Sequence, residues 1–413
     1  MIGRALLLFT LLVGGVHAAD DWVDRVDEAL TWSGKDDRAR GRISGLFDLE
    51  QYALPQPAPG VISSDAASLL VPRLSLFFDG QLGGHLYAFA QARLDRGFDP
   101  SDDRLRARLD EYALRWSVGQ AGCLDVQVGK FGTVVGNWVA RHDSWTNPFI
   151  TAPLPYENLT GLWDNEPARS ADQLLVWSHV RPGLPSPVVV EEKYLRIPII
   201  WGPSYGTGAA VAGAVGRFRY AFEVKNASLS SRPDTWSANA ARWDAPTLSG
   251  RVRYVPSEQW EFGWSVSSGS FLRPSAAPLL DPSLSRSRYR EIVLGEDLTY
   301  AWHHLQVWAE IYAARFQIPL VGNADTLAYY IESRYRFTPF FSAALRWSQQ
   351  LYGTVDAGGL AVPWGKDVWQ IDAAPAWRVT AHAQIKLQYS VQQSPHAAGE
   401  LSQMVAVQGT VRF

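Results

Sequence analysis

Two short motifs in the chain have the residue types of catalytic or metal-binding sites. The first, Gly202-Pro203-Ser204-Tyr205-Gly206, matches the G-x-S-x-G pattern in which the serine is a nucleophile. That motif acts at a strained turn between a strand and a helix, whereas here it joins two extended segments, which favours a tight turn. The second, His303-His304, places adjacent side chains on opposite faces of a strand, and no zinc-binding spacing accompanies it. We therefore predict no catalytic residue, no metal site and no cofactor.

Charged side chains of both signs recur at every second position of segments that are otherwise apolar. In 382–393, for example, Lys386 lies between Ile385 and Leu387. Lys or Arg facing lipid at the bilayer midplane costs about 2–4 kcal/mol, so in a membrane-spanning strand such residues must face inward. There they either line an aqueous lumen or pair with one another across strands. The predicted lining residues are Arg42, Arg93, Arg115, Arg219, Glu223, Arg334, Arg346 and Lys386.

The composition excludes several classes of protein. The 413 residues include 38 basic and 41 acidic side chains, a balance that removes the electrostatic case for binding nucleic acid. The mean hydropathy of -0.12 excludes a bundle of several membrane helices. A single cysteine, Cys123, excludes a disulfide framework. Aromatic residues nevertheless make up 12% of the chain, which is unusual for an ordinary soluble enzyme and calls for a structural reason.

The N-terminus has the pattern of an export signal. Arg4 precedes the apolar run 5–13, and Val16-His17-Ala18 forms a small-residue cleavage site, so we predict a signal peptide over residues 1–18. The following segment, 19–38, is predicted to be periplasmic and contains a possible short helix over 21–30.

Period-2 alternation over the rest of the chain predicts an all-β fold. It is clear at 40–53, 217–229, 289–301, 325–337 and 340–351. Short and long connectors alternate between the segments, which is typical of a membrane barrel with tight turns at one end and longer loops at the other. We predict a single antiparallel transmembrane β-barrel over 39–413 with about 16 to 18 strands, because the prolines of 172–216 leave that region ambiguous. Tryptophans at strand ends are predicted to form interfacial girdles.

The C-terminal segment carries a resemblance to a known class. Val405, Val407, Gly409, Val411 and the terminal Phe413 share one face of the last predicted strand. In this the chain resembles the outer-membrane barrels of Gram-negative bacteria, whose last strand ends in an aromatic residue. The resemblance implies that Phe413 is the signal read by the barrel assembly machinery.

A second resemblance involves the long connector 135–171. The preceding stretch, from Val126 to Gly136, resembles the strand-to-loop passage of porins related to the phosphate-selective type. The resemblance implies a long third loop that folds inward and narrows the pore; a solvated loop on the outer surface is the alternative. In the first case its polar residues would face the solute. These predicted constriction residues are Arg141, His142, Asp143, Glu157, Asp164, Glu166 and Arg169.

Together these patterns predict an outer-membrane porin that passes small hydrophilic solutes or ions by diffusion. The predicted partners are those solutes, the lipids of the outer membrane and the assembly machinery, with a homotrimer as a possible assembly. Two alternatives stay open from the sequence: a hydrolase with its site at the barrel rim, and a structural or adhesive barrel whose lumen is blocked.

Overall fold

The computed structural model describes residues 16–34, 38–54, 66–97, 104–119, 122–180, 195–232, 243–393 and 401–413. Strands dominate, and the helices are short pieces in the connections between them. Those pieces are α2 (Val16–Ala29), η2 (Val139–Arg141), α3 (Leu154–Glu157), α4 (Ala171–Trp177), η5 (Pro274–Leu279) and η6 (Arg286–Arg288). Within the described ranges, no helix is long and apolar enough to cross a membrane.

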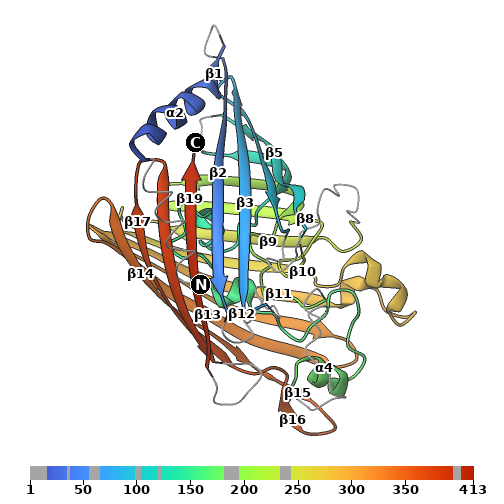
Figure 1. The fold of residues 1–413 in the computed structure, drawn as a ribbon. Helices are drawn as coiled ribbons and strands as arrows, with labels where there is room; N and C mark the ends of the chain where they lie inside the picture. The colour runs from blue at the N-terminus through green and yellow to red at the C-terminus, as the bar shows by residue number, and fades with distance from the viewer. Residues whose placement is uncertain are drawn as a thin grey trace.

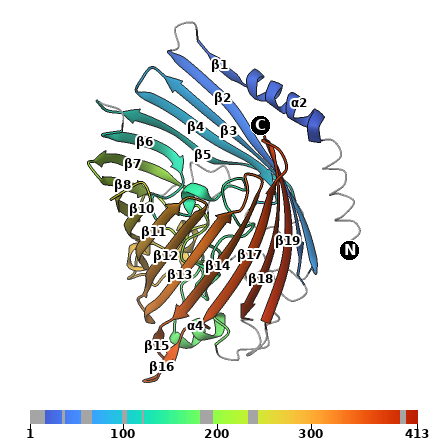
Figure 2. The same cartoon turned by 90° about the vertical axis from the view of Figure 1, so that its left-hand side faces the viewer.

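Sixteen antiparallel strands close into one barrel (Figures 1 and 2). Each pairs with its neighbours in sequence, and β19 returns to pair with β2, with Gln408 opposite Glu50. The strands are β2 (Ala39–Ala53), β3 (Ser68–Leu82), β4 (Leu86–Asp95), β5 (Arg106–Ser117), β6 (Asp125–Phe131), β7 (Gly206–Val215), β8 (Phe218–Lys225), β9 (Thr247–Tyr254), β10 (Trp260–Ser270), β11 (Arg290–Trp302), β12 (Leu305–Ile318), β13 (Gly322–Arg336), β14 (Phe341–Tyr352), β17 (Val368–Arg378), β18 (Ala383–Gln393) and β19 (Leu401–Arg412). The prediction of an antiparallel barrel is confirmed, at the lower strand count.

The region that left the count open is a loop. Between the end of β6 at Phe131 and the start of β7 at Gly206, the described residues form short helices and irregular chain but no barrel strand. We call 132–205 the long loop; it is longer than the predicted 135–171. Its prolines explain the difference, because a proline cannot donate a hydrogen bond to a strand ladder.

The two ends of the barrel differ in their connections. The turn end, which also holds the C-terminus, has short links such as 216–217 and 303–304. The loop end has the long loop, 271–289, and 353–367, which contains the hairpin of β15 (Thr354–Asp356) and β16 (Ala361–Pro363). One link departs from the predicted alternation: at the loop end, only residues 319–321 join β12 to β13. These two strands are long and continue their pairing to the tip.

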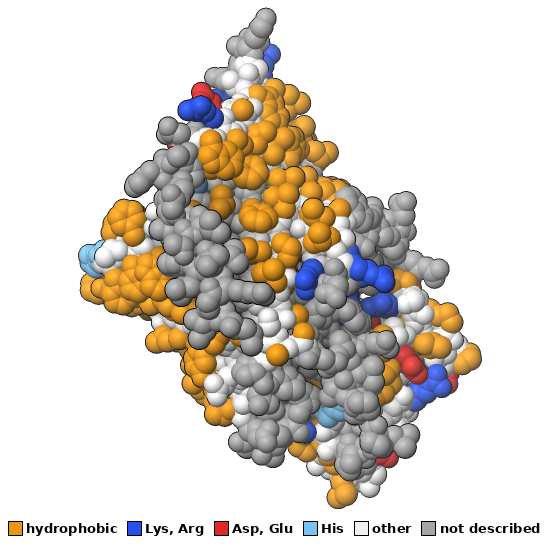
Figure 3. All heavy atoms as spheres, viewed as in Figure 1, with side chains coloured by type: hydrophobic (Ala, Val, Ile, Leu, Met, Phe, Trp, Pro, Cys, Tyr) orange, Lys and Arg blue, Asp and Glu red, His pale blue; other side chains and the backbone are white. Residues whose placement is uncertain are grey.

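The outer wall is apolar. Outward positions alternate with inward ones, as in β13, where every second side chain from Ala324 to Glu332 is buried and Ile331 is exposed. Figure 3 shows apolar side chains gathered over β2 and β3. Exposed aromatic rings collect near the turn end, as predicted for an interfacial girdle: Trp116, Trp260, Trp302, Phe337, Phe340 and Trp377. Amphipathic rings at this depth are stable where lipid meets water.

Helix α2 lies beside the turn end (Figures 1 and 2). It leads into β1 (Thr31–Ser33), which pairs with the start of β2. Two polar contacts fasten the helix to the barrel: Asp27 binds the Arg42 guanidinium at 2.9 Å, and Asp24 lies 2.9 Å from the His382 ring. The predicted short helix is therefore present, although it begins earlier than residue 21. Residues 1–15, most of the predicted signal peptide, lie outside the described part.

Candidate functional site

The long loop turns into the barrel and is fastened to the far wall by a buried glutamate. Leaving β6, the chain reaches Glu310 on β12, whose carboxylate accepts hydrogen bonds from the backbone N–H groups of Asn137 and Trp138. Its second oxygen accepts the Tyr156 hydroxyl at 2.6 Å. One acidic side chain thus satisfies three buried donors from two places in the loop, which would otherwise be costly to bury.

Gly136 permits this close approach. Its φ of +76° lies in the left-handed region, and a Cβ there would come within 2.1 Å of the Tyr312 hydroxyl and 2.7 Å of Glu310 Oε1. Only glycine combines this backbone conformation with the available space.

Three more charged residues of the wall hold the loop along its path. On β13, Glu332 binds Arg141, and Tyr330 accepts a second hydrogen bond from the same guanidinium at 2.9 Å. Near the start of the loop, Glu223 on β8 accepts the Thr133 hydroxyl at 2.7 Å. The Lys386 ammonium donates to the carbonyl oxygens of Ser144 and Asn147 on the other side of the lumen. The loop therefore crosses the barrel and is bound from β8 around to β18.

Arg346 is the most enclosed of these charges. Its side chain is fully buried, 2.8 Å from Asp372 and 3.8 Å from Glu332. It also donates to the carbonyl oxygen of Thr151 at 3.1 Å and to the Thr151 hydroxyl at 3.0 Å. A buried cation with this many partners has a structural role, because removing any one partner leaves charge uncompensated.

Beyond these contacts, the loop builds an apolar core inside the lumen. Leu174, Ile197 and Ile200 are fully buried, and they belong to one cluster with Phe316 and Trp364 from the wall and its loop-end links. The loop-end half of the barrel is in this respect like the interior of a globular protein. Many inward positions of the strands thus contact the loop and have no access to water.

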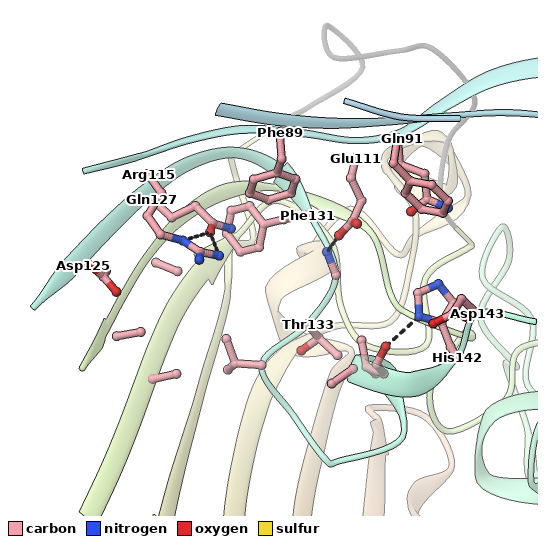
Figure 4. Close-up of a pocket in the computed structure, with 18 of the residues that line it drawn as sticks. Phe89, Gln91, Glu111, Arg115, Asp125, Gln127, Phe131, Thr133, His142 and Asp143 are labelled. Atoms are coloured by element: carbon pink, nitrogen blue, oxygen red, sulfur yellow. Dashed lines mark hydrogen bonds between the residues drawn. The ribbon is translucent and has the colours of Figure 1, made fainter. Parts of the chain in front are cut away.

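The turn-end half is open. A cavity of about 1110 Å³, which we call the vestibule, lies between the long loop and the turn-end wall. Figure 4 shows Arg115 and Gln127 on one side of it and His142 and Asp143, from the loop, on another. Its lining includes the arginines Arg42, Arg115, Arg219, Arg251, Arg253 and Arg412 and the acids Asp27, Glu111, Asp125 and Asp143.

Small side chains give the vestibule its width on one side. Ala210, Ala212 and Ala214 of β7 and Ala221 of β8 line it, and Ala212 lies opposite Ala221 in the pairing of the two strands. The alanine side chain is short, so at these positions the cavity extends almost to the backbone of the wall.

Six of the seven predicted constriction residues separate into three groups; the seventh, Glu157, is partly buried at the end of α3 and does not line the vestibule. His142 and Asp143 line the vestibule. Arg141 and Asp164 are held in ion pairs, Arg141 with Glu332 and Asp164 with Arg273 at 2.5 Å. Glu166 and Arg169 lie 3.7 Å apart with Arg169 largely exposed, so they form a surface pair away from the vestibule. The prediction that all seven face the solute is thus too broad, because the sequence pattern does not reveal which loop charges meet the wall.

Glu157 and His142 have altered acidities. Burial raises the pKa of Glu157 to about 8, although the nearby Arg346 opposes the rise. Burial and the charge of Arg93 lower the pKa of His142. In its neutral form, the His142 ring can donate from Nδ1 to the Val139 carbonyl at 2.6 Å and accept from the Tyr205 hydroxyl at Nε2 at 2.9 Å.

The predicted lining residues also divide. Arg42, Arg115 and Arg219 line the vestibule, with Arg115 bound to Gln127 at 2.8 Å. Arg93, on β4, lies 3.4 Å from Asp110 in a charged group at mid-wall. Arg334 donates to Gln306 and to the loop carbonyl of Thr146. Glu223, Arg346 and Lys386, in contrast, are buried against the loop and do not line the vestibule.

Sequence reasoning left out three basic residues at the turn end. Arg336, Arg378 and Arg412 end β13, β17 and β19. Alternation does place each of them on the polar face of its strand, but the predicted set of lining residues does not include them. The loop residue that lies against two of them, Trp145, carries no such signal. Its ring centroid is 4.2 Å from the Arg412 guanidinium carbon and 5.2 Å from that of Arg378.

The C-terminus completes the wall. Phe413 exchanges backbone hydrogen bonds with Gly45 of β2, and its ring covers the Gly45 Cα. Atoms of Phe413 also reach the lining of the vestibule, so the residue is not confined to the lipid face. Its predicted role as an assembly signal stays a prediction.

Metal and hydrolase chemistry has no support in the described residues. None of their His, Cys, Asp and Glu side chains form a group of three that could hold a metal ion. Ser204, the central residue of the G-x-S-x-G match, lies at a turn where its backbone N–H donates to the Trp201 carbonyl at 2.8 Å. The motif joins the long loop to β7, and no helix follows it.

Comparison with solved structures gives the fold a name. OmpF of Salmonella typhi, solved with daunomycin, aligns with a TM-score of 0.56 over 92% of this chain and 100% of its own, at 10% identity. The anion-selective porin of Comamonas acidovorans gives 0.54 over 91% and 100%, at 11% identity. The channel DcaP of Acinetobacter baumannii gives 0.56 over 92% and 99%, at 10% identity.

The chain has the fold of an outer-membrane porin. The likeness covers the whole barrel, with strands that close as described above. OmpT of Vibrio cholerae, an outer-membrane protein also solved in a trimeric form, aligns at a TM-score of 0.53 and 7% identity over 91% of this chain and all of its own. No family model matches the sequence. No curated protein matches it either. At these identities the porin likeness concerns the fold alone, and the turn end corresponds to the periplasmic side of such barrels.

Proposed function

We propose that this barrel is a passive channel of the bacterial outer membrane for small hydrophilic solutes and ions, and not an enzyme. The observation that supports this most is the vestibule, a polar cavity of about 1110 Å³ inside the wall. This cavity fits a pore whose selectivity depends on its width and its lining.

The proposed path passes between the long loop and the charged wall of β2 to β5. On the opposite side the apolar core of the loop end fills the lumen. The β2 to β5 wall instead carries Arg73 and Arg93, whose side chains keep 23% and 15% of their exposure. The acids Asp48, Glu50 and Asp110 accompany them. Charges of both signs at a narrow passage favour polar solutes over apolar ones.

The constriction in this proposal is formed by His142 and Asp143 of the loop. Both line the vestibule, whereas Arg141 is paired with the wall and Glu166 and Arg169 lie at the surface. The carboxylate of Asp143 accepts the backbone N–H groups of Trp145 and Thr146, each at 2.8 Å, which fixes the turn that faces the passage.

Conductance across a planar bilayer tests the proposal. Purified protein, refolded and inserted, should give stepwise ion currents. If insertion is confirmed by protease protection and no current appears, the channel is refuted. A blocked barrel with a structural or adhesive role would then be favoured, and the apolar core inside the loop end is the observation that supports it. A rim-sited hydrolase would require esterase or protease turnover by the same preparation.

The assembly and the partners belong to the same proposal. We expect the apolar wall to contact outer-membrane lipid, Phe413 to be read by the barrel assembly machinery, and three copies to associate. Cross-linking in detergent followed by mass measurement tests the trimer; a single-copy mass would exclude it.

A further inference from the structure

The turn end of the lumen contains a group of basic side chains whose charge is not neutralised. Arg334, Arg336, Arg378 and Lys386 line a small cavity of about 40 Å³, and no acidic residue lines it. Trp145 lines both this cavity and the vestibule, and Arg412 reaches Trp145 from the vestibule side. We call these five basic residues and Trp145 the arginine pocket.

The acids that influence these arginines are bound elsewhere. Among the carboxylates that act on Arg334 and Arg412 are Glu332 and Asp27, but Glu332 is paired with Arg141 and Asp27 with Arg42. Within the described part of the chain, none of the five basic residues forms a salt bridge. Arg334 and Arg412 are acted on by neighbouring arginines, and Lys386 is also acted on by the more distant carboxylates of Asp48, Asp143 and Glu50.

The barrel maintains this repulsion by fixing the cationic groups individually. Lys386 is buried and held by two loop carbonyl oxygens, and Arg334 by Gln306. Arg378 and Arg412 lie against Trp145, whose π-electrons stabilise a cation without neutralising it. The Arg336 side chain is exposed at the end of β13 and makes no hydrogen bond among the described residues. Guanidinium groups arranged in this way leave N–H donors for a ligand.

We propose that the arginine pocket binds small oxyanions that carry two or more negative charges, such as a di- or tricarboxylate, on the periplasmic side of the constriction. Guanidinium groups bind such oxygens in pairs, with charge-assisted hydrogen bonds. A cavity of about 40 Å³ accommodates one anionic group, and the vestibule beside Trp145 has room for the rest of the molecule. Several uncompensated cations favour a polyvalent anion over chloride. This proposal gives a solute class to the channel proposed above. Anion binding itself does not require a conducting channel; only its biological role rests on the proposed function.

Equilibrium dialysis of radiolabelled citrate against the detergent-solubilised full-length protein at low ionic strength tests the site without requiring any current. Arg336→Gln with Arg378→Gln should weaken citrate binding about tenfold or more, because each lost guanidinium removes a charge-assisted contact. Neither residue is in an ion pair among the described residues, so the double variant is expected to fold. Its urea unfolding curve checks this.

Arg115→Gln with Arg219→Gln is the matched control. Both residues line the vestibule, from β5 and β8, outside the arginine pocket, and the double variant removes the same two positive charges. It should change citrate binding less than twofold. Equal weakening in both variants would show a diffuse field in place of a site and would overturn the proposal, as would absence of citrate binding by the unaltered protein. Ion current without citrate binding would support the channel function and refute the arginine pocket. Citrate binding without ion current would support the arginine pocket and refute the channel function.

Sidedness gives a second readout in the bilayer. Citrate added to the side of the turn end should reduce chloride current at a lower concentration than citrate added to the loop end. Equal potency from the two sides would contradict the placement of the pocket below the loop.

Discussion

The two halves of the lumen use charged residues in opposite ways. In the loop-end half, Arg346 is fully buried and bonded to Asp372, and the long loop covers it. In the turn-end half, Arg336 and Arg378 are exposed to a water-accessible space and have no acidic partner among the described residues. Charge on the inner wall of a barrel therefore does not by itself mark a solute path; the presence of a partner separates the structural charges from those available to a ligand.

Removing part of the long loop should have the largest effect of the changes considered. Deleting 140–168 takes away much of the apolar core and the turn that lines the vestibule. Single-channel conductance should then rise, at least about twofold, since conduction depends on the narrowest width. An unchanged conductance in a correctly inserted barrel would show that the loop does not limit the pore.

Arg346→Gln tests whether the paired charges are structural. The change leaves Asp372 without its buried cation and removes one of the two cations beside Glu332, so the free energy of unfolding should fall by about 3–5 kcal/mol. Urea unfolding in detergent, followed by tryptophan fluorescence, measures the loss. A change within error would mean that water reaches this site and that the loop-end half is less sealed than described.

The pH dependence of stability tests the environment of Glu157. Its pKa is raised to about 8, above the value of about 4.3 expected in an unfolded chain, so the folded state binds the proton more tightly. Stability from this group is present below about pH 4 and is lost as the pH rises toward 8.

Glu157→Gln mimics the protonated form. The free energy of unfolding should therefore fall by at least about 1 kcal/mol less between pH 5 and 9 in this variant than in the unaltered protein. Unfolding curves of the two proteins at both pH values give the comparison. Parallel pH trends would show that Glu157 ionises freely in the folded state.

The smallest effect on stability and conductance is expected for an exposed ion pair that lies outside the lumen. Arg315 and Asp325 lie 2.7 Å apart, each about half exposed. Because solvent screens such a pair, Arg315→Gln should leave both stability and conductance unchanged within error. A clear loss would indicate that the pair contacts another copy or lipid head groups.

Much of the fold was predictable because a barrel strand is a local pattern. Alternation located 40–53, 325–337 and 340–351 within a few residues of β2, β13 and β14. The predicted count of 16 to 18 includes the observed 16 and was left open only by 172–216, where the described residues before β7 fold against the inside of the wall. The apolar residues there, such as Ile197 and Ile200, bury as strand residues do, yet without a strand ladder.

The candidate site was less predictable, for a physical reason. Parity tells which face of the wall a residue occupies but not what stands in front of it. Lys386 and Arg219 share the inward face, yet a loop distant in sequence covers the first and water reaches the second. Contacts such as Asn137 with Glu310 join residues far apart along the chain, and no spacing in a single sequence reveals them.

Substitutions at the alanines of β7 and β8 can change the width of this channel. The side chains of Ala212 and Ala221 make no hydrogen bond, and they border open space on strands fixed by their backbone ladders. Exchanging one for valine or leucine would add two or three carbon atoms to the lining and narrow the cavity, while the number of strands and the barrel's circumference stay the same. Related channels could thus diverge in the size of molecule they admit through single substitutions on this strip, independently of the charges that choose among those molecules.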